Sequence, residues 1–422
     1  MFKKLLIYFI IFMQVNILLA KENSASRDRI HSVRKAVDSI GKLDEKEVSI
    51  VDSFRNMFID GKVSGQVRSV YAGYNQKESG VKSSYATALG GIIKYELAEF
   101  NGFNAAAAVY TSHDIPLLSG ADLKHNSELS SSEGSYTDIA EAYINYKYQN
   151  FNFRAGRQPL DTPLADTDDI RMIKNSFEAY VATFDYTGLT FMAGYIQSWQ
   201  GVDAGLDDKW VLAGIDGTNF GGVSYSDGFE FNLWFYNITQ LTNALYMDVG
   251  LQYDMTDAIV LHLGAQYLSE TTLDNSGIAA DIYGGFFELV FHDIGFNAAF
   301  NKSQKNVNKQ SFSGTGGGTM YTSMDSMIID NIANDRDVLA YVLGISYSID
   351  YFRFIYAHGD FVGGKNTQGV KEHILEHDIG FSYDVNDEFL VSAIYTISQD
   401  QENINKSEYD FERVQLMVNY NF

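Results

Sequence analysis

The stretch Phe229-Glu230-Phe231-Asn232-Leu233-Trp234-Phe235 places an apolar side chain at every odd position, with Glu230 and Asn232 among the residues between. Successive side chains of a β-strand point to opposite faces, so a period of two predicts a strand with one apolar face. The period recurs from Gly61 onward in Val63/Val67/Tyr71, Ile93/Tyr95/Leu97, Leu339/Tyr341/Leu343/Ile345/Tyr347 and Phe389/Val391/Ala393/Tyr395/Ile397. We count about eighteen such segments of roughly 9–15 residues, the length that a tilted strand needs to cross a bilayer.

The connections between these segments alternate between tight and long. Tight turns are expected at Asn101-Gly102, Gln149-Asn150, Thr187-Gly188, Asp227-Gly228, Met255-Thr256-Asp257, His292-Asp293, Asp350, and from Asp384 to Glu388. Longer, polar connections are expected at 76–84, 113–134, 159–175, 199–217, 270–280, 303–336, 362–371 and 399–408, and a short one at 239–243. This alternation is typical of outer-membrane proteins, which have short periplasmic turns and long external loops. The sequence therefore predicts an all-β fold, a transmembrane antiparallel β-barrel of about eighteen strands.

Composition and the first residues predict export to a membrane. Lys3 and Lys4 precede an apolar run from Leu5 to Phe12, and Ala20 ends the stretch, which predicts a signal peptide over 1–20. The net charge of −23 argues against a nucleic-acid partner, and the absence of cysteine excludes disulfides and thiolate metal sites. Beyond the signal, no apolar run approaches the roughly 20 residues of a membrane helix. A large secreted β-sandwich or β-helix is the soluble alternative.

The predicted chain has two parts after the signal. Residues 21–60 form a periplasmic N-terminal segment that is partly helical, because Ile30, Val33, Val37 and Ile40 recur at helical spacing. Residues 61–422 form the barrel, with both ends in the periplasm. The last strand alternates to a terminal Phe422, a pattern that looks like the signal by which barrel-assembly machinery receives its clients.

Three stretches together resemble the OprD family of outer-membrane porins. They are the opening strand Gly61 to Tyr71, Gly156-Arg157-Gln158, and the set Pro163, Asp169, Arg171, Phe177 and Glu178. The resemblance implies an eighteen-stranded channel in the outer membrane of a Gram-negative bacterium, with a third loop that folds inward and narrows the pore. The chain departs from the family pattern in its extra N-terminal residues and in Ala179, where a glycine is expected.

Strand parity predicts which charged residues face the lumen. The basic set is Arg68, Lys94, Lys147, Arg154, Arg353 and Arg413, and the acidic set is Glu96, Glu141, Glu178, Glu230, Asp248, Glu288, Glu376 and Asp378. These charges either pair and brace the wall or create a field across the pore. Loop 159–175 adds Asp161, Asp166, Asp168, Asp169, Arg171 and Lys174. It is expected to form the constriction, with Arg154 and Asp169 nearest the narrowest point; an exposed loop that binds divalent cations and lipopolysaccharide is the alternative.

The function predicted from these features is passive diffusion of small hydrophilic solutes and ions, with a mild cation preference. No enzyme, cofactor or metal site is expected, because His373 and His377 are about 13 Å apart on a strand and no phosphate-binding motif surrounds Gly314 to Gly318. Alternatives are an adhesin or structural barrel that uses loops 113–134 and 303–336, and a barrel hydrolase. Expected partners are outer-membrane lipid, lipopolysaccharide and, in a trimer, two further copies of the chain.

Overall fold

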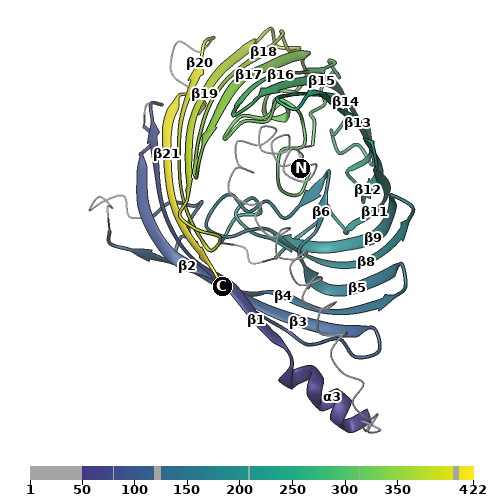
Figure 1. The fold of residues 1–422 in the computed structure, drawn as a ribbon. Coiled ribbons are helices and arrows are strands. Elements are labelled where there is room, and N and C mark those ends of the chain that lie inside the picture. The colour runs from purple at the N-terminus through teal and green to yellow at the C-terminus, as the bar shows by residue number, and fades with distance from the viewer. Residues whose placement is uncertain (1–49, 79, 118–124, 208–209, 313, 403–407) are drawn as a thin grey trace.

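A computed structural model describes residues 50–78, 80–117, 125–207, 210–312, 314–402 and 408–422. The expected signal peptide and most of the segment 21–60 lie outside the described residues. The described part forms a closed antiparallel barrel of eighteen strands, which confirms the predicted fold class (Figure 1). The barrel strands are β1 (Lys62–Gln76), β2 (Ser84–Glu96), β3 (Phe103–Ile115), β4 (Ser135–Tyr148), β5 (Phe151–Gln158), β8 (Ser176–Tyr186), β9 (Leu189–Gln200), β11 (Thr218–Ser226), β12 (Phe229–Ile238), β13 (Thr242–Thr256), β14 (Ile259–Thr272), β15 (Ala280–Phe291), β16 (Ile294–Ser303), β17 (Val338–Ile349), β18 (Phe352–Gly363), β19 (Glu372–Asp384), β20 (Phe389–Asp400) and β21 (Phe411–Asn421).

The barrel closes between its first and last strands. β1 pairs with β21 in a register that runs from Gln66↔Asn421 to Gln76↔Phe411. Gly65 and Phe422 exchange two backbone hydrogen bonds of 3.0 Å each beyond that register. Closure leaves no unpaired strand edge, which is the condition for a sheet to span a hydrocarbon layer.

The tight turns have the residues that their backbone requires. Asn101, Gln149, Thr187 and Asp350 all have φ between 46° and 51°. Such left-handed conformations are frequent in two-residue hairpin turns and match the twist of the flanking strands. The predicted tight turns lie at one end of the barrel and the longer connections at the other, together with the one short connection between Ile238 and Thr242, as the sequence predicts.

The outer face of the barrel is apolar. On β12 and β17, Phe235 and Leu343 are each 50% exposed, whereas Trp234 and Tyr236 on the opposite face are 5% and 1% exposed. Exposed apolar side chains of this density in every strand are expected of a lipid-facing wall and not of a soluble surface. In the described residues, no helix has the length and hydropathy to cross a membrane.

The long connection between β16 and β17, residues 304–337, folds into the barrel and not outward. Met320, Met324 and Met327 are at most 2% exposed, and they belong to one buried cluster with Phe361 of β18 and Ile374 of β19. Wall glycines make room for this loop, since a Cβ on Gly359 would overlap the sulfur of Met324. The expectation that this loop is external is therefore wrong for its central part.

Shorter elements accompany the barrel. Inside it lie the two-residue strands β6 (Asp161–Thr162) and β7 (Ala165–Asp166) and the 3₁₀ turn η2 (Ile329–Asn331), and β10 (Val211–Leu212) pairs with the end of β9. The helix α3 (Ile50–Ile59) precedes β1 and lies outside the ring of strands (Figure 1). The backbone N–H of Ala98, at the β2–β3 turn, donates to the carbonyl of Met57 at 3.0 Å. The helix is thereby attached to the tight-turn end of the barrel.

Candidate pore constriction

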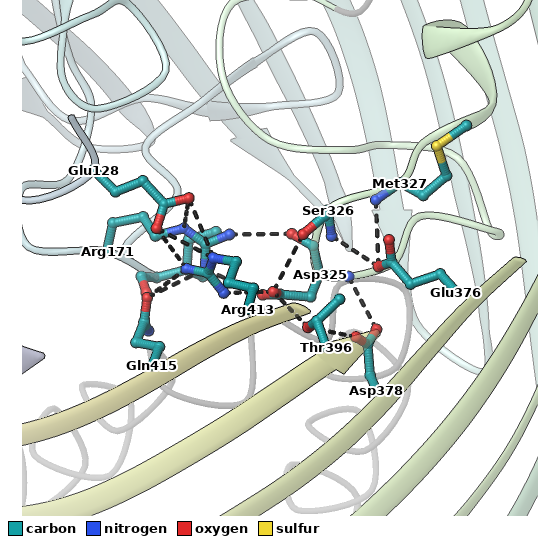
Figure 2. A network of polar contacts seen from close by, with 11 residues as sticks. Glu128, Arg171, Asp325, Ser326, Met327, Glu376, Asp378, Thr396, Arg413 and Gln415 are labelled. Atoms are coloured by element: carbon teal, nitrogen blue, oxygen red, sulfur yellow. Dashed lines mark hydrogen bonds and ion pairs between the residues drawn. The ribbon is translucent and has the colours of Figure 1, made fainter. Parts of the chain in front are cut away.

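Three long loops meet the barrel wall at one network of polar side chains (Figure 2). Glu128 comes from loop 116–134, Arg171 from loop 159–175 and Asp325 from loop 304–337. The wall contributes Arg413 of β21. Its side chain faces inward, because it lies on the strand face opposite the exposed residues Leu416 and Val418. The three loops are therefore joined to one another through the wall.

Asp325 and Arg413 are the centre of this network. A guanidinium N–H of Arg413 donates to Asp325 at 2.5 Å, and a second donates to Glu128 at 2.7 Å. Arg171 donates to the other oxygen of Asp325 at 3.2 Å. The side chains of Arg413 and Asp325 are 1% and 0% exposed. Burial alone would raise the pKa of Asp325, but the two arginines outweigh it and lower that pKa, so Asp325 is ionised.

Two buried carboxylates of β19 hold the backbone of loop 304–337. Glu376 accepts hydrogen bonds from the N–H groups of Ser326 at 2.9 Å and Met327 at 3.4 Å. Asp378 accepts from the N–H of Asp325 at 3.2 Å and from the hydroxyl of Thr396 at 2.7 Å. These three hydrogen bonds from consecutive backbone N–H groups fix this tip of the loop to the wall.

Loop 159–175 is attached to the wall by a second ion pair. Arg68 of β1 donates to Asp169 at 2.6 and 3.2 Å and to the backbone carbonyl of Arg171 at 2.6 Å. Burial acts to raise the pKa of Asp169, but Arg68 lowers it overall. Lys94 of β2 donates to Glu141 of β4 at 2.8 Å, and Lys174 of the loop lies 3.8 Å from the same carboxylate. The loop is thus inside the barrel, next to β1, β4 and β21.

The cavity above this network is acidic. Asp168, Asp203 and Arg171 line an open cavity with about 1120 Å³ of empty space. Burial and nearby Asp203 raise the pKa of Asp168, and burial and nearby Asp161 raise the pKa of Asp166 to about 7. Among the described residues, no lysine or arginine forms an ion pair with Asp166, Asp168 or Asp203. Asp168 and Asp203 line this cavity and form the surface that we call the acidic vestibule, and Asp166 lies next to it, since its carboxyl group accepts from the N–H of Asp168 at 3.4 Å.

The remaining predicted site residues lie elsewhere. Arg154 of β5 donates to Asn145 at 3.3 Å and stacks over the Tyr143 ring at 4.5 Å, so the partner of Asp169 is Arg68 and not Arg154. Lys147 and Arg353 lie near the tight-turn ends of β4 and β18. Glu178 lies 3.8 Å from Arg157 on the side of β8 that carries exposed Tyr180 and Phe184, so the prediction that it faces the lumen is wrong.

Sequence reasoning missed Glu128, Asp325 and Asp203, because all three are in long loops whose paths have no local signal. One signal was available for Asp325. The surrounding segment contains Met320, Met324 and Met327, apolar residues that an external loop has no reason to concentrate. In the part of the chain that the structure describes, no group of three or more His, Cys, Asp or Glu residues is arranged to hold a metal ion.

Comparisons with known proteins show which solved structures share this fold. No protein-family model matches the sequence, and no curated protein matches it significantly. Solved structures do match. The Pseudomonas aeruginosa protein OpdK, crystallised with vanillate, is 15% identical with a TM-score of 0.73, over 87% of this chain and 99% of that one. Acinetobacter baumannii OccAB4 is 14% identical with a TM-score of 0.71, over 86% and 98%. Pseudomonas aeruginosa OpdQ is 16% identical with a TM-score of 0.70, over 87% and 99%.

The chain has the fold of OprD-type porin barrels. The resemblance predicted from the opening strand and the third loop is thereby confirmed at the level of the fold. A further structure of OpdK describes it as an outer membrane protein, and its 17% identity and TM-score of 0.72 show the same likeness. An OprD-type barrel is a fold of the Gram-negative outer membrane, which agrees with the predicted location.

Proposed function

We propose that this protein is an outer-membrane channel through which small hydrophilic solutes and ions diffuse passively. The observation that carries the proposal is the arrangement of loops 116–134, 159–175 and 304–337, which enter a closed barrel and meet at the ion pair of Arg413 and Asp325. A barrel with an apolar outer face and charged side chains on its inner face provides an aqueous path. Loops attached inside the barrel set the width of that path. A barrel that served only as an anchor would not need polar loops fixed in its interior.

The charges of the constriction support a mild preference for cations. Arg68, Arg413 and Lys94 are the basic wall residues nearest to the loops, and each already has a carboxylate partner. An anion would have to compete with these buried partners for the guanidinium groups. The acidic vestibule, by contrast, holds carboxyl groups without a basic partner among the described residues. A pore selects ions by the charges on its own lining, so we expect it to favour cations and neutral solutes.

An anionic aromatic solute is the second candidate, since OpdK was crystallised with vanillate. The alternative to a channel is an adhesin or structural barrel. Because the centre of loop 304–337 is buried, a smaller part of this loop is exposed for contact with another surface. Insertion by barrel-assembly machinery, contact with lipopolysaccharide, and assembly as a trimer stay predictions from the sequence. No catalytic role is proposed.

Liposome swelling tests the proposal. Purified barrels in phospholipid vesicles would be diluted into isotonic solutions of a neutral pentose, a monoamine salt or an aromatic monocarboxylate such as vanillate. We expect swelling with the pentose, faster swelling with the cation and the slowest swelling with the carboxylate. Swelling that is absent for all three solutes, from protein shown to be folded, would contradict the channel; faster swelling with vanillate would support the anionic candidate.

A further inference from the structure

The helix α3 has an apolar side that the rest of the described chain leaves open. Phe54 and Phe58 lie one turn apart on it and are 55% and 50% exposed. Their rings contact each other edge to face, with centroids 5.5 Å apart. Asn56 lies on the opposite side of the helix, because residues four apart share a side and residues two apart do not. The role of this helix is separate from the proposed channel function and does not depend on it.

The last turn of α3 is attached to the outer surface of the wall. The backbone carbonyl of Met57 accepts from the N–H of Ala98 at 3.0 Å, and the carbonyl of Phe58 accepts from the hydroxyl of Tyr95. Tyr95 points outward from β2 and is 38% exposed. A Cβ on Gly61 would overlap the Tyr95 ring, so the link from α3 to β1 runs directly over that ring. These contacts hold the helix outside the pore.

Outward aromatic residues at the strand ends give the depth of this attachment. Tyr95 is the next-to-last residue of β2, and Phe103, 48% exposed, is the first residue of β3. Tyr148 and Tyr186 end β4 and β8 at the next two tight turns and are each 60% exposed. Such aromatic girdles lie at the boundary between lipid and water. The contacts with Tyr95 and Ala98 therefore place the end of α3 at the level of the girdle on the tight-turn side.

The direction of α3 is visible in Figure 1, which looks into the ring of strands. The helix lies beside the ring and not across its opening, and it is seen from the side. Because its last turn is attached to the wall, its other end extends away from the barrel at the level of the girdle. On that part of the wall, Val63 pairs with Tyr95 and is 59% exposed, and Ile93 is 56% exposed. The apolar side of α3 is therefore continuous with the lipid-facing wall.

The side chains of α3 suit the boundary between phospholipid headgroups and acyl chains. Helices that lie in this boundary have Phe, Trp or Leu on one side and polar residues on the other. Phe54 and Phe58 supply the apolar side, and exposed Asn56 belongs to the polar side. Arg55 is exposed between the two sides, and its side chain is long enough to extend to a headgroup phosphate while its aliphatic part stays beside the rings.

We propose that α3 lies in the phospholipid leaflet on the tight-turn side of the membrane, with Phe54 and Phe58 among the acyl chains and Asn56 toward water. Lipid is the occupant of this apolar side because the helix is attached at the aromatic girdle, extends sideways from the wall and continues a surface that already faces lipid. In this position α3 is a membrane anchor beside the pore and not a plug of the lumen.

Spin labelling tests this proposal, because the chain has no cysteine of its own. Phe54→Cys and the matched control Asn56→Cys would each carry a nitroxide, in full-length barrels reconstituted into vesicles of phosphatidylcholine and phosphatidylglycerol. Oxygen collides with a nitroxide mainly inside the bilayer, whereas a water-soluble nickel chelate collides with it outside. Val67→Cys on the lipid-facing wall and Asp227→Cys in a tight turn calibrate the two environments. We expect the ratio of oxygen to nickel collisions for Phe54→Cys to lie near that for Val67→Cys and several-fold above that for Asn56→Cys.

A second pair of variants tests whether the aromatic side chains hold the helix in the leaflet. In the Phe54→Cys background, Phe58→Ser should lower the ratio of oxygen to nickel collisions several-fold, whereas Asn56→Ser on the opposite side should leave it unchanged. The heat-dependent shift of the barrel on a gel reports that each variant is folded.

Two results would overturn the proposal. A ratio for Phe54→Cys equal to that for Asp227→Cys would place the helix in water, and few collisions with either reagent would show that protein covers it. Channel failure would appear only in the conductance.

Discussion

Replacing Asp325 by asparagine should release the tip of loop 304–337 from the wall. Asp325 is fully buried and accepts hydrogen bonds from Arg413 at 2.5 Å and Arg171 at 3.2 Å. Removing one partner of a buried ion pair typically costs about 3–5 kcal/mol. Glu128 still faces both arginines, so the lower end of this range is expected. Since about 1.4 kcal/mol corresponds to a factor of ten, the population of the detached loop should rise roughly a hundredfold.

Single-channel recording in planar bilayers would measure the effect. We expect Asp325→Asn channels to show a larger mean conductance and more frequent transitions between levels, because the detached tip no longer narrows the pore. Asp330→Asn is the control, since Asp330 lies in the same loop but accepts a hydrogen bond from the hydroxyl of Ser311 and not from Arg171 or Arg413. Asp325→Asn channels with the amplitude and dwell times of the wild type would refute the role of this ion pair.

Three further outcomes follow from the site and the fold. Asp168→Asn combined with Asp203→Asn should shift the reversal potential toward anions in a salt gradient, and an unchanged potential would mean that the acidic vestibule is not on the ion path. Because the pKa of Asp166 is raised to about 7, this carboxyl gains a proton as the pH falls from 8 to 6, so cation preference should fall over that interval, and Asp166→Asn should remove the step. Deletion of Phe422 removes both backbone hydrogen bonds to Gly65 and should reduce the amount of folded barrel in outer membranes; wild-type amounts would argue against its role in closure and assembly.

The fold could be predicted from the sequence because each barrel strand has its own alternation of outward and inward side chains. The alternation from Phe229 to Phe235 predicts a strand with an outer and an inner face, and in the structure Phe235 is exposed on the outer face and Trp234 is buried on the inner face. The turns Asn101-Gly102 and Thr187-Gly188 have the left-handed backbone that their residue types favour. Each of these signals spans only a few residues, so no long-range information is needed.

The constriction could be predicted only in part. Parity places Arg68, Arg413, Glu376 and Asp378 on the inner face, and the structure has them there. The partners of these residues could not be predicted, because Asp169 is 101 residues from Arg68 and Asp325 is 88 residues from Arg413 in the sequence. The path of a long loop depends on which wall surface accepts it, here the space above Gly359 and the carboxylates of β19. The prediction for Glu178 is wrong because this residue shares a side of β8 with exposed Tyr180 and Phe184; the extra residue of the neighbouring bulge, Gln197, is on β9.

The channel itself is tested most directly by recording current through the purified wild-type protein in a planar bilayer. We expect stepwise, uniform increases in current as single folded barrels insert, with a reversal potential in a salt gradient that is displaced toward the cation. A folded, inserted protein that gives no current steps would contradict the proposed channel, since the loops joined at the ion pair of Arg413 and Asp325 would then close the barrel completely.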